Sequence, residues 1–571
     1  MQNNSESQDA GKYSPLDQQK GEIRVLILQP GGESDELHCS LETYQLESCR
    51  ELDALSYAWG DPKPVEPIFV DGSRTLIAHN LSVALRHLRY PHSSRVLWID
   101  AVCINQADVD ERSHQVFMMN RVYTTANQVL IWLGEARADS DFVMTRLKEL
   151  AGGQRATAAE KLRLRGLFHD CLMDRDWWGR LWIVQEVVLA KSDPIIICGH
   201  SYVSWNTFQK AIDVGSLGFL LQGELWAKER LERSNHRISL RLLREEYQNS
   251  KISDEPTPSL YTLLFLTKSF QSTDPRDKIY GCLGLLSTRD REIMKPDYQK
   301  PTELVFLEVA KYLLTRSEWG FYSGFSVSTR GKLSMTAPSW LPNFAEQSGL
   351  SPTNPVMLLL PHSHKVDCGR RNVSFQDRER ILAVAGLVLD TVEIAVELKS
   401  DPDLLLDQIA ELELLAKQAV CRELPLDDAR NCFMNLTRDR DVFQVFPSQV
   451  SNSPLALREQ YEALTRRVER WSGKDTTSQY ERPFFNIIKH LLPGMHFFVT
   501  NMGFFGITGA SVCKGDTVSF LFGEELPIVL RPQGSLYTML GAANVSGVMN
   551  GEVTGDMYQK GLVEKTTFLI G

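Results

Sequence analysis

The sequence lacks several features that would place it in a well-defined class. It contains no run of about 18 apolar residues, which argues against a membrane span. Its 10 cysteines are scattered singly, without a CxxC pair, so neither a zinc ribbon nor a disulfide framework is indicated. It also lacks a GxxxxGKS or GxxxxGKT phosphate loop, which excludes that class of NTPase. We therefore expect a reduced, cytoplasmic protein.

An excess of positive charge is also missing. Lys and Arg number 62 against 72 Asp and Glu, for a formal net charge of −10, so nucleic-acid binding is disfavoured. Residues 1–21 are polar and have no apolar core, which predicts a disordered leader and not a signal peptide. A length of 571 residues is too great for one hydrophobic core and indicates several domains.

Short apolar runs alternate with helical patterns from residue 22 onward. Helices are expected at 108–124 and 178–190, Asn80 is expected to cap another helix, and Asp71-Gly72 favours a hairpin. Strands separated by helices predict βαβ units and a mostly parallel sheet, so we expect an α/β domain over residues 22–215. The predicted strands are Ile23–Leu28, Leu55–Trp59, Val96–Asp100, Val129–Leu133 and Ile195–Cys198.

The rest of the chain differs in its predicted secondary structure. Residues 216–345 are expected to form a helical extension, and residues 346–482 a mixed helical and loop region that includes a helical pattern at 403–422. After Pro483 the sequence favours strands, which predicts a small β-rich domain over 483–571. His362, His364 and Cys368 offer metal-ligand types, but they lie in a polar stretch, and we predict no metal site there.

Three blocks carry the strongest functional signal: ALSYAWGD at 54–61, LWIDAVCINQ at 97–106 and RLWIVQEVVLA at 180–190. Ligands of open α/β sheets bind beyond the carboxyl ends of the strands. Asp100 and the turn at Gly60 are expected at that edge, where Asp100 either caps a turn or contacts a ligand. We expect Trp59, Trp98 and Trp132 to be core residues. Cys103 has no evident His partner and is expected to be packed.

The third block places an indole and a carboxylate four residues apart. On a helix, Trp182 and Glu186 would share one face, with Arg180 near the helix start. A carboxylate beside an indole is partly desolvated, which raises its pKa and suits it to hold a sugar hydroxyl or to act as a base. The alternative is an exposed glutamate in an ordinary ion pair, which residue chemistry alone favours.

Taken together, the blocks resemble the HET domain, the heterokaryon-incompatibility domain of filamentous fungi. That family reads LSYxWG, then LWIDAxCINQ with an ERxxQVxxMxxIY helix and a WLG strand, then RxWxxQE. The present chain shows each in order, with Val122-Tyr123 in place of Ile-Tyr. The likeness continues in DPRDKIYGCLGLL, PDYQKP, PSWLPNF and KGDTVSFLFGEELPIVLR, so it covers most of the chain. It implies a role in nonself recognition and programmed cell death.

HET domains in turn resemble TIR domains, which have a flavodoxin-like α/β fold. In enzymatic TIR domains a Trp-x-x-x-Glu helix supplies the glutamate that supports cleavage of NAD, and Trp182 to Glu186 fits this spacing. The resemblance implies that Glu186 is catalytic and that NAD is a substrate and not a cofactor, with no metal required. The substrate-binding residues that it implies are Ser56, Tyr57, Trp59, Gly60, Asp100, Asn105, Gln106, Arg180 and Trp182. The hairpin and the helices at 141–173 are insertions relative to a TIR domain.

Two other functions remain open on the sequence. The first alternative is a recognition or adaptor module without chemistry. The second is an accessory HET protein of a biosynthetic gene cluster. The resemblance implies an incompatible partner protein and self-association as interactions, since TIR-like enzymes tend to work as assemblies.

Overall fold

The computed structural model divides the chain into two compact units, Met1–Pro301 and Thr302–Gly571. The leader up to residue 12, the 403–422 pattern except residue 408, and the His362, His364 and Cys368 group lie outside the described residues. The described residues are 13–49, 51–61, 63–137, 139–215, 217, 228–253, 258–316, 320–325, 327, 337–346, 372–399, 408, 494–524, 526–545, 548, 558 and 563–571. Among them, no helix is both long and apolar enough to cross a membrane.

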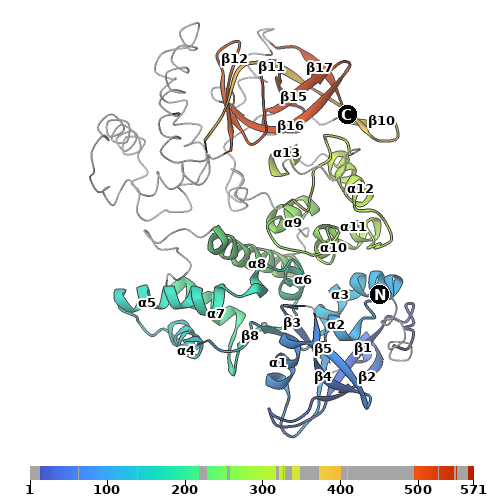
Figure 1. The fold of residues 1–571 in the computed structure, drawn as a ribbon, viewed down its shortest axis with the longest axis vertical. Helices are drawn as coiled ribbons and strands as arrows, with labels where there is room; N and C mark the ends of the chain where they lie inside the picture. Colours follow the sequence, from blue (N-terminus) through green and yellow to red (C-terminus); the bar gives the residue numbers. More distant parts are fainter. Residues whose placement is uncertain are drawn as a thin grey trace. The chain divides into compact units, whose positions relative to one another are not determined.

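The first unit contains a nine-stranded sheet with the order β5-β4-β2-β1-β6-β3-β7-β8-β9, blue to teal in Figure 1. The bounds are β1 (Glu22–Leu28), β2 (His38–Gln45), β3 (Asp53–Tyr57), β4 (Pro64–Val70), β5 (Ser73–Ala78), β6 (Arg95–Trp98), β7 (Gln128–Trp132), β8 (Ile195–Cys198) and β9 (Ser201–Ser204). Asp71 and Gly72 connect β4 to β5 with positive φ angles of 50° and 77°, as the hairpin prediction requires.

The sheet is mixed, whereas the sequence predicted a mostly parallel one. Strands β6, β3, β7 and β8 are parallel neighbours, and β2 is parallel to β4. Strand β1, however, runs antiparallel to both β2 and β6, and the pairs β4–β5 and β8–β9 are antiparallel. Parallel order therefore describes the β6-β3-β7-β8 stretch and not the whole sheet.

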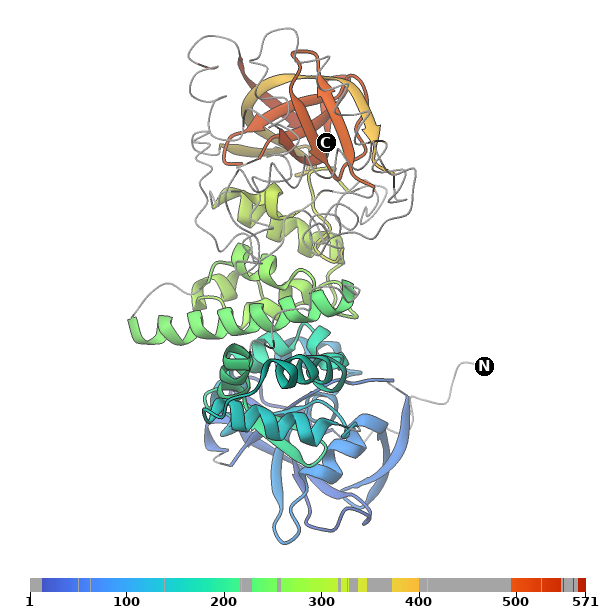
Figure 2. The ribbon, with the colours of Figure 1, turned by 90° about the vertical axis from the view of Figure 1, so that its left-hand side faces the viewer.

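Helices connect and cover these strands. Asp108 caps α3, because its side chain accepts from the backbone N–H groups of Asp110 and Glu111, both at 3.0 Å. Helix α4 and helix α7 pack together and against β9, and α6 packs on α8, the long green helix of Figure 2. The bounds are α1 (His79–Leu88), α2 (Asp100–Cys103), α3 (Val109–Thr125), α4 (Ser140–Ala151), α5 (Ala158–Phe168), α6 (Ile183–Val188), α7 (Trp205–Gly215), α8 (Lys228–Ser253), α9 (Leu260–Thr267), α10 (Asp277–Leu283) and α11 (Thr288–Ile293).

Two local expectations are corrected. Asn80 is not a cap: the cap of α1 is Ala78, and the Asn80 amide instead donates to the Ala58 carbonyl at 2.5 Å and accepts from the Trp132 indole at 3.1 Å. The helix predicted at 178–190 is much shorter, because a 3-10 turn at Asp176–Gly179 and a non-helical Arg180 precede α6. The polar side chain of Asn80 thus serves tertiary packing between α1 and β7.

The second unit begins with α12 (Thr302–Thr315) and α13 (Phe321–Gly324) and then forms an eight-stranded sheet, yellow to red in Figure 2. The 17-residue strand β11 pairs with β12, β14 and β17 along its length, so the pairings close into a ring. A core including Phe498, Val518 and Phe520 fills it. The bounds are β10 (Val373–Gln376), β11 (Ile381–Glu397), β12 (His496–Thr500), β13 (Phe505–Thr508), β14 (Thr517–Leu521), β15 (Ile528–Gln533), β16 (Leu536–Val545) and β17 (Lys565–Ile570).

Candidate functional site

Glu186 lies at the centre of a buried polar cluster that connects β3 to α6. The Ser56 hydroxyl, near the carboxyl end of β3, donates to Glu186 Oε2. The same hydroxyl accepts a hydrogen bond of 2.8 Å from the Trp177 indole. Ser56 and Glu186 are at most 1% exposed. The indole therefore fixes the serine hydroxyl toward the carboxylate, and we call Ser56, Trp177, Arg180 and Glu186 the Glu186 cluster.

Arg180 is the cation of this cluster. Its Nη1 lies 3.9 Å from Glu186 Oε1 and donates to the Tyr57 carbonyl. The side chain is 19% exposed, against 2% for that of Glu186. Arg180 is therefore the more exposed of the two charged members of the cluster.

Asp100 and Trp59 flank the cluster at the carboxyl edge of the sheet. Strands β3 and β6 are parallel neighbours, so the residues that follow them emerge side by side. The Trp59 indole contacts both Asp100 carboxylate oxygens, at 3.3 and 3.2 Å. The expectation that Trp59 is a core residue is wrong, because it is 36% exposed, whereas Trp98 and Trp132 are fully buried as expected.

Burial controls the ionisation of both carboxyl groups. It raises the pKa of Glu186 to about 7; the Asp100 charge adds to this rise, while Arg180 and the Ser56 hydrogen bond oppose it. Burial also raises the pKa of Asp100, again opposed by the Arg180 charge. Glu186 therefore changes protonation near neutral pH, which is the range in which a general acid or base works best.

The raised pKa of Glu186 predicts a pH-dependent stability. An ordinary glutamate loses its proton near pH 4.5, so between about pH 4.5 and 7 the folded chain binds more protons than the unfolded chain. Stability should therefore fall as pH rises through this range, by roughly 3 kcal/mol at most. Glu186→Gln removes the titrating group, so the melting temperature of the wild type relative to this variant should drop between pH 5 and pH 8. A constant difference across that range would contradict the shifted pKa.

Trp182 and Glu186 lie one helical turn apart, because the Glu186 backbone N–H donates to the Trp182 carbonyl at 3.2 Å, but their side chains have different partners. Because α6 begins at Ile183, Trp182 is its N-terminal flanking residue. The Trp182 indole donates to Asp277 at 3.3 Å, and Asp277 also accepts a 2.5 Å hydrogen bond from Tyr298. Burial raises the pKa of Asp277 to about 6. The Trp182 side chain therefore bonds to the carboxyl group of Asp277 on α10 and not to the Glu186 cluster.

Three further predicted residues shape the loops around the cluster. Gly60 has φ +67°, a left-handed conformation that glycine adopts without strain. The Gln106 amide donates to the Asp100 carbonyl at 3.0 Å, and the Asn105 side chain accepts from the Ala107 amide at 3.2 Å. Asn105 and Gln106 thus order the turn that presents Asp100.

Sequence reasoning missed the buried ion pair beneath this turn. Arg24 Nη1 and Nη2 lie 2.6 and 2.9 Å from the two Glu111 carboxylate oxygens. Glu111 also accepts from the backbone N–H of Asn105 at 2.7 Å, and Arg24 donates to the Cys103 carbonyl at 3.2 Å. The available signal was Arg24 itself, a single charge inside the apolar run EIRVLIL. Cys103 is packed as expected, 1% exposed, and burial raises its pKa to about 12.

Chemically, the site offers two carboxyl groups whose pKa values are raised by burial and lowered by the charge of one guanidinium, that of Arg180. A carboxyl group that titrates near neutral pH, as Glu186 does, can act as an acid or a base in glycosidic-bond cleavage. Glu186 can accept or return a proton near neutral pH, and Asp100 can contact a ligand beside the exposed Trp59 ring. The arrangement suits a ligand with hydroxyl groups and an aromatic ring.

The sequence is similar to known heterokaryon incompatibility proteins in two regions and along most of its length. Residues 53–186 match the family model described as heterokaryon incompatibility protein (HET), and residues 459–562 match the Het-6 beta-barrel domain. The chain is 24% identical over 653 aligned positions to heterokaryon incompatibility protein 6, OR allele, of Neurospora crassa, covering 93% of this chain and 94% of that one. No solved structure matches. The first match begins at β3 and ends at Glu186.

Proposed function

We propose that this relative of heterokaryon incompatibility proteins acts in nonself recognition and triggers programmed cell death, by cleaving NAD at the Glu186 cluster. The observation that carries the proposal is the hydrogen bond between Ser56 and Glu186, which joins the two ends of the HET match. A segment whose first strand and last helix converge on one buried, titratable carboxyl group has the form of a site.

Strand order supports a TIR-like, flavodoxin-like core. Counted along the chain, the parallel strands β3, β6, β7 and β8 lie in the spatial order 2-1-3-4. This is the beginning of the flavodoxin-like order 2-1-3-4-5, in which ligands bind where the order reverses, between the first and third strands. Those strands are β3 and β7 here, and Ser56 and Tyr57 end β3.

The proposed reaction is hydrolysis of the bond between nicotinamide and ribose. The bond electrons leave with nicotinamide, which becomes neutral, and water adds to the ribose carbon and loses a proton. In this mechanism ionised Glu186 holds ribose hydroxyls and stabilises the oxocarbenium-like transition state, while Asp100 and Arg180 orient the dinucleotide. The exposed Trp59 ring offers a face for stacking.

Expression of the intact chain in a fungal host tests this proposal. Cellular NAD should fall before viability does, and Glu186→Ala should remove both effects at equal protein level. Retained toxicity in a normally expressed Glu186→Ala variant would rule out the catalytic role.

A second candidate function is a recognition module without chemistry. The near-complete burial of Glu186 and its bond to Ser56 favour it, because a carboxylate can also be retained to fix a buried network. In that case the partner protein binds the loops that carry Trp59 and Asp100, and toxicity proceeds without NAD loss. Measuring NAD and viability in the same cultures separates the two functions.

A further inference from the structure

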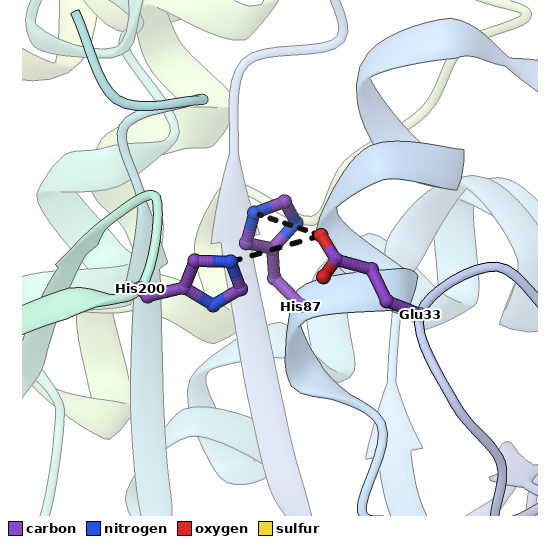
Figure 3. Close-up of side chains that lie close together, drawn as sticks. All are labelled: Glu33, His87 and His200. Atoms are coloured by element: carbon purple, nitrogen blue, oxygen red, sulfur yellow. Dashed lines mark ion pairs between the residues drawn. The ribbon is translucent and has the colours of Figure 1, made fainter.

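Three segments distant in sequence bring two imidazoles and a carboxylate together in the first unit (Figure 3). Glu33 lies in the β1–β2 loop, His87 near the end of α1, and His200 in the β8–β9 turn. Glu33 Oε1 is 4.0 Å from His87 Nε2 and 3.7 Å from His200 Nε2. The candidate ligand atoms all lie within 4.8 Å of one another. Among the described residues, this is the group with the composition and spacing of a metal site.

The tautomer of His87 favours a metal ligand. His87 Nδ1 lies 2.9 Å from the Val83 carbonyl, one turn earlier in α1, and a carbonyl only accepts, so Nδ1 carries the proton. The lone pair of the neutral ring is then on Nε2, the atom that lies 4.0 Å from Glu33 Oε1. Metal-binding histidines typically donate their other ring N–H to a carbonyl or carboxylate, which fixes the ring orientation.

Neighbouring residues hold the backbone of the ligand residues in place. Arg86 and Arg89, which flank His87, donate to carbonyls of the Glu33 loop: Arg86 to Glu33 and Asp35 at 3.1 and 2.8 Å, and Arg89 to Glu36 at 2.8 Å. The His200 turn is equally constrained, because Gly199 has φ +56° and a Cβ there would come within 2.8 Å of the Ala136 side chain. The backbone segments that carry Glu33 and His200 are thus held in place before any ion binds.

Ion pairing alone explains the arrangement of these three side chains poorly. The two imidazole rings are 4.6 Å apart between centroids, so protonation of both would place like charges together. A divalent cation binds the neutral rings and is balanced by the carboxylate. Two histidines and one glutamate form a known zinc ligand set, with a fourth position left for water.

We propose that Glu33, His87 and His200 bind a divalent transition-metal ion of the zinc class. Zinc–nitrogen and zinc–oxygen distances near 2.1 Å in a tetrahedron put ligand atoms about 3.4 Å apart, so the 3.7 and 4.0 Å separations need only small side-chain movements. The side chains of Glu33 and His200 are 62% and 73% exposed and free to make them. The ion would tie the β8–β9 turn to α1 and to the β1–β2 loop.

The test compares zinc binding by the full chain and by single variants after chelator treatment. Equilibrium dialysis of the wild type against Zn²⁺ should show one equivalent that His200→Ala loses, with at least a tenfold weaker affinity. Zn²⁺ should also raise the melting temperature of the wild type and not of His200→Ala. Because His200 is exposed, this variant should fold normally.

The matched control is His79→Ala, which removes an exposed histidine 3.1 Å from Glu66 that lacks a second imidazole. It should retain the full equivalent, so cysteines and histidines elsewhere in the chain cannot account for the difference. Equal zinc content and equal melting shifts in the two variants would overturn the proposal, as would the absence of any bound equivalent in the wild type. Glu33→Gln should weaken binding, which separates a carboxylate ligand from two histidines alone.

Discussion

Glu186→Gln is expected to reduce nicotinamide release and cell killing by at least about 100-fold, because glutamine cannot provide the negative charge that stabilises an oxocarbenium-like transition state. The amide is nearly isosteric with the carboxyl group and can still accept from the Ser56 hydroxyl. Folding should therefore be preserved, and above pH 7 the variant should be at least as stable as the wild type, because it buries no charge.

The matched control for this variant is Asp53→Asn. Asp53 begins the same strand, β3, and pairs with Arg95 at 2.8 Å at the end away from Ser56. Its neutralisation should cost modest stability and leave activity within about twofold, since most partly exposed ion pairs contribute little. Comparable losses of activity in both variants would point to a general structural effect and against a chemical role for Glu186.

Glu111→Ala is expected to cause the largest loss of stability. It leaves Arg24, whose side chain is 3% exposed, as an uncompensated buried charge, and breaking such a pair costs about 3–5 kcal/mol. The melting transition of the first unit should fall by roughly 10 °C. The backbone N–H of Asn105 also loses its acceptor, so the turn that presents Asp100 should loosen and activity should fall with stability.

The double variant Arg24→Met with Glu111→Leu separates the cost of an unpaired charge from the value of the pair. Replacing a buried pair by apolar residues of similar volume is often neutral, so the double variant should recover most of the lost melting temperature. If it were as unstable as Glu111→Ala, the hydrogen bonds to Cys103 and Asn105 would carry the stability instead of the pairing of charges.

The central strands were predictable because their composition matches their surroundings. Strand β8, IIIC, has the predicted bounds, and β7 is shifted by one residue at both ends, since short β-branched runs buried between neighbours leave a clear pattern. Strand β2, HCSLETYQ, was missed because its antiparallel position leaves most side chains exposed or half-buried. Strand direction depends on connections and partners, which explains why the mixed character of the sheet did not follow from the apolar runs.

The strands of the C-terminal unit were hard to predict because their pairing partners lie far away in the sequence. Strands β10 and β11 lie within residues 346–482, for which helices and loops were expected, yet β11 pairs with β14 and β17 more than a hundred residues later. Its apolar run ILAVAGLVLDTVEIAVE resembles a buried helix as well as a strand, and periodicity alone does not distinguish them.

The site was predictable only in part, for a related reason. Glu186, Ser56 and Arg180 were identified through the motif blocks, but Trp177 orients Ser56 across 121 positions and no local pattern encodes that contact. The Trp182 to Glu186 spacing does correspond to one helical turn, but the Trp182 indole donates to Asp277 and not to the Glu186 cluster, a contact that the spacing does not encode. The Glu33, His87 and His200 group joins a loop, a helix and a turn that are distant in sequence, and it leaves no spacing signal at all.

The most direct test of the central claim is nicotinamide release from NAD by the purified full chain at high protein concentration, followed by chromatography from pH 5 to pH 9. We expect release by the wild type that rises through about pH 7, as the Glu186 carboxyl group loses its proton, and no release by Glu186→Gln. Release that is equal in the two proteins, or that is absent from a folded and assembled wild type, would contradict it.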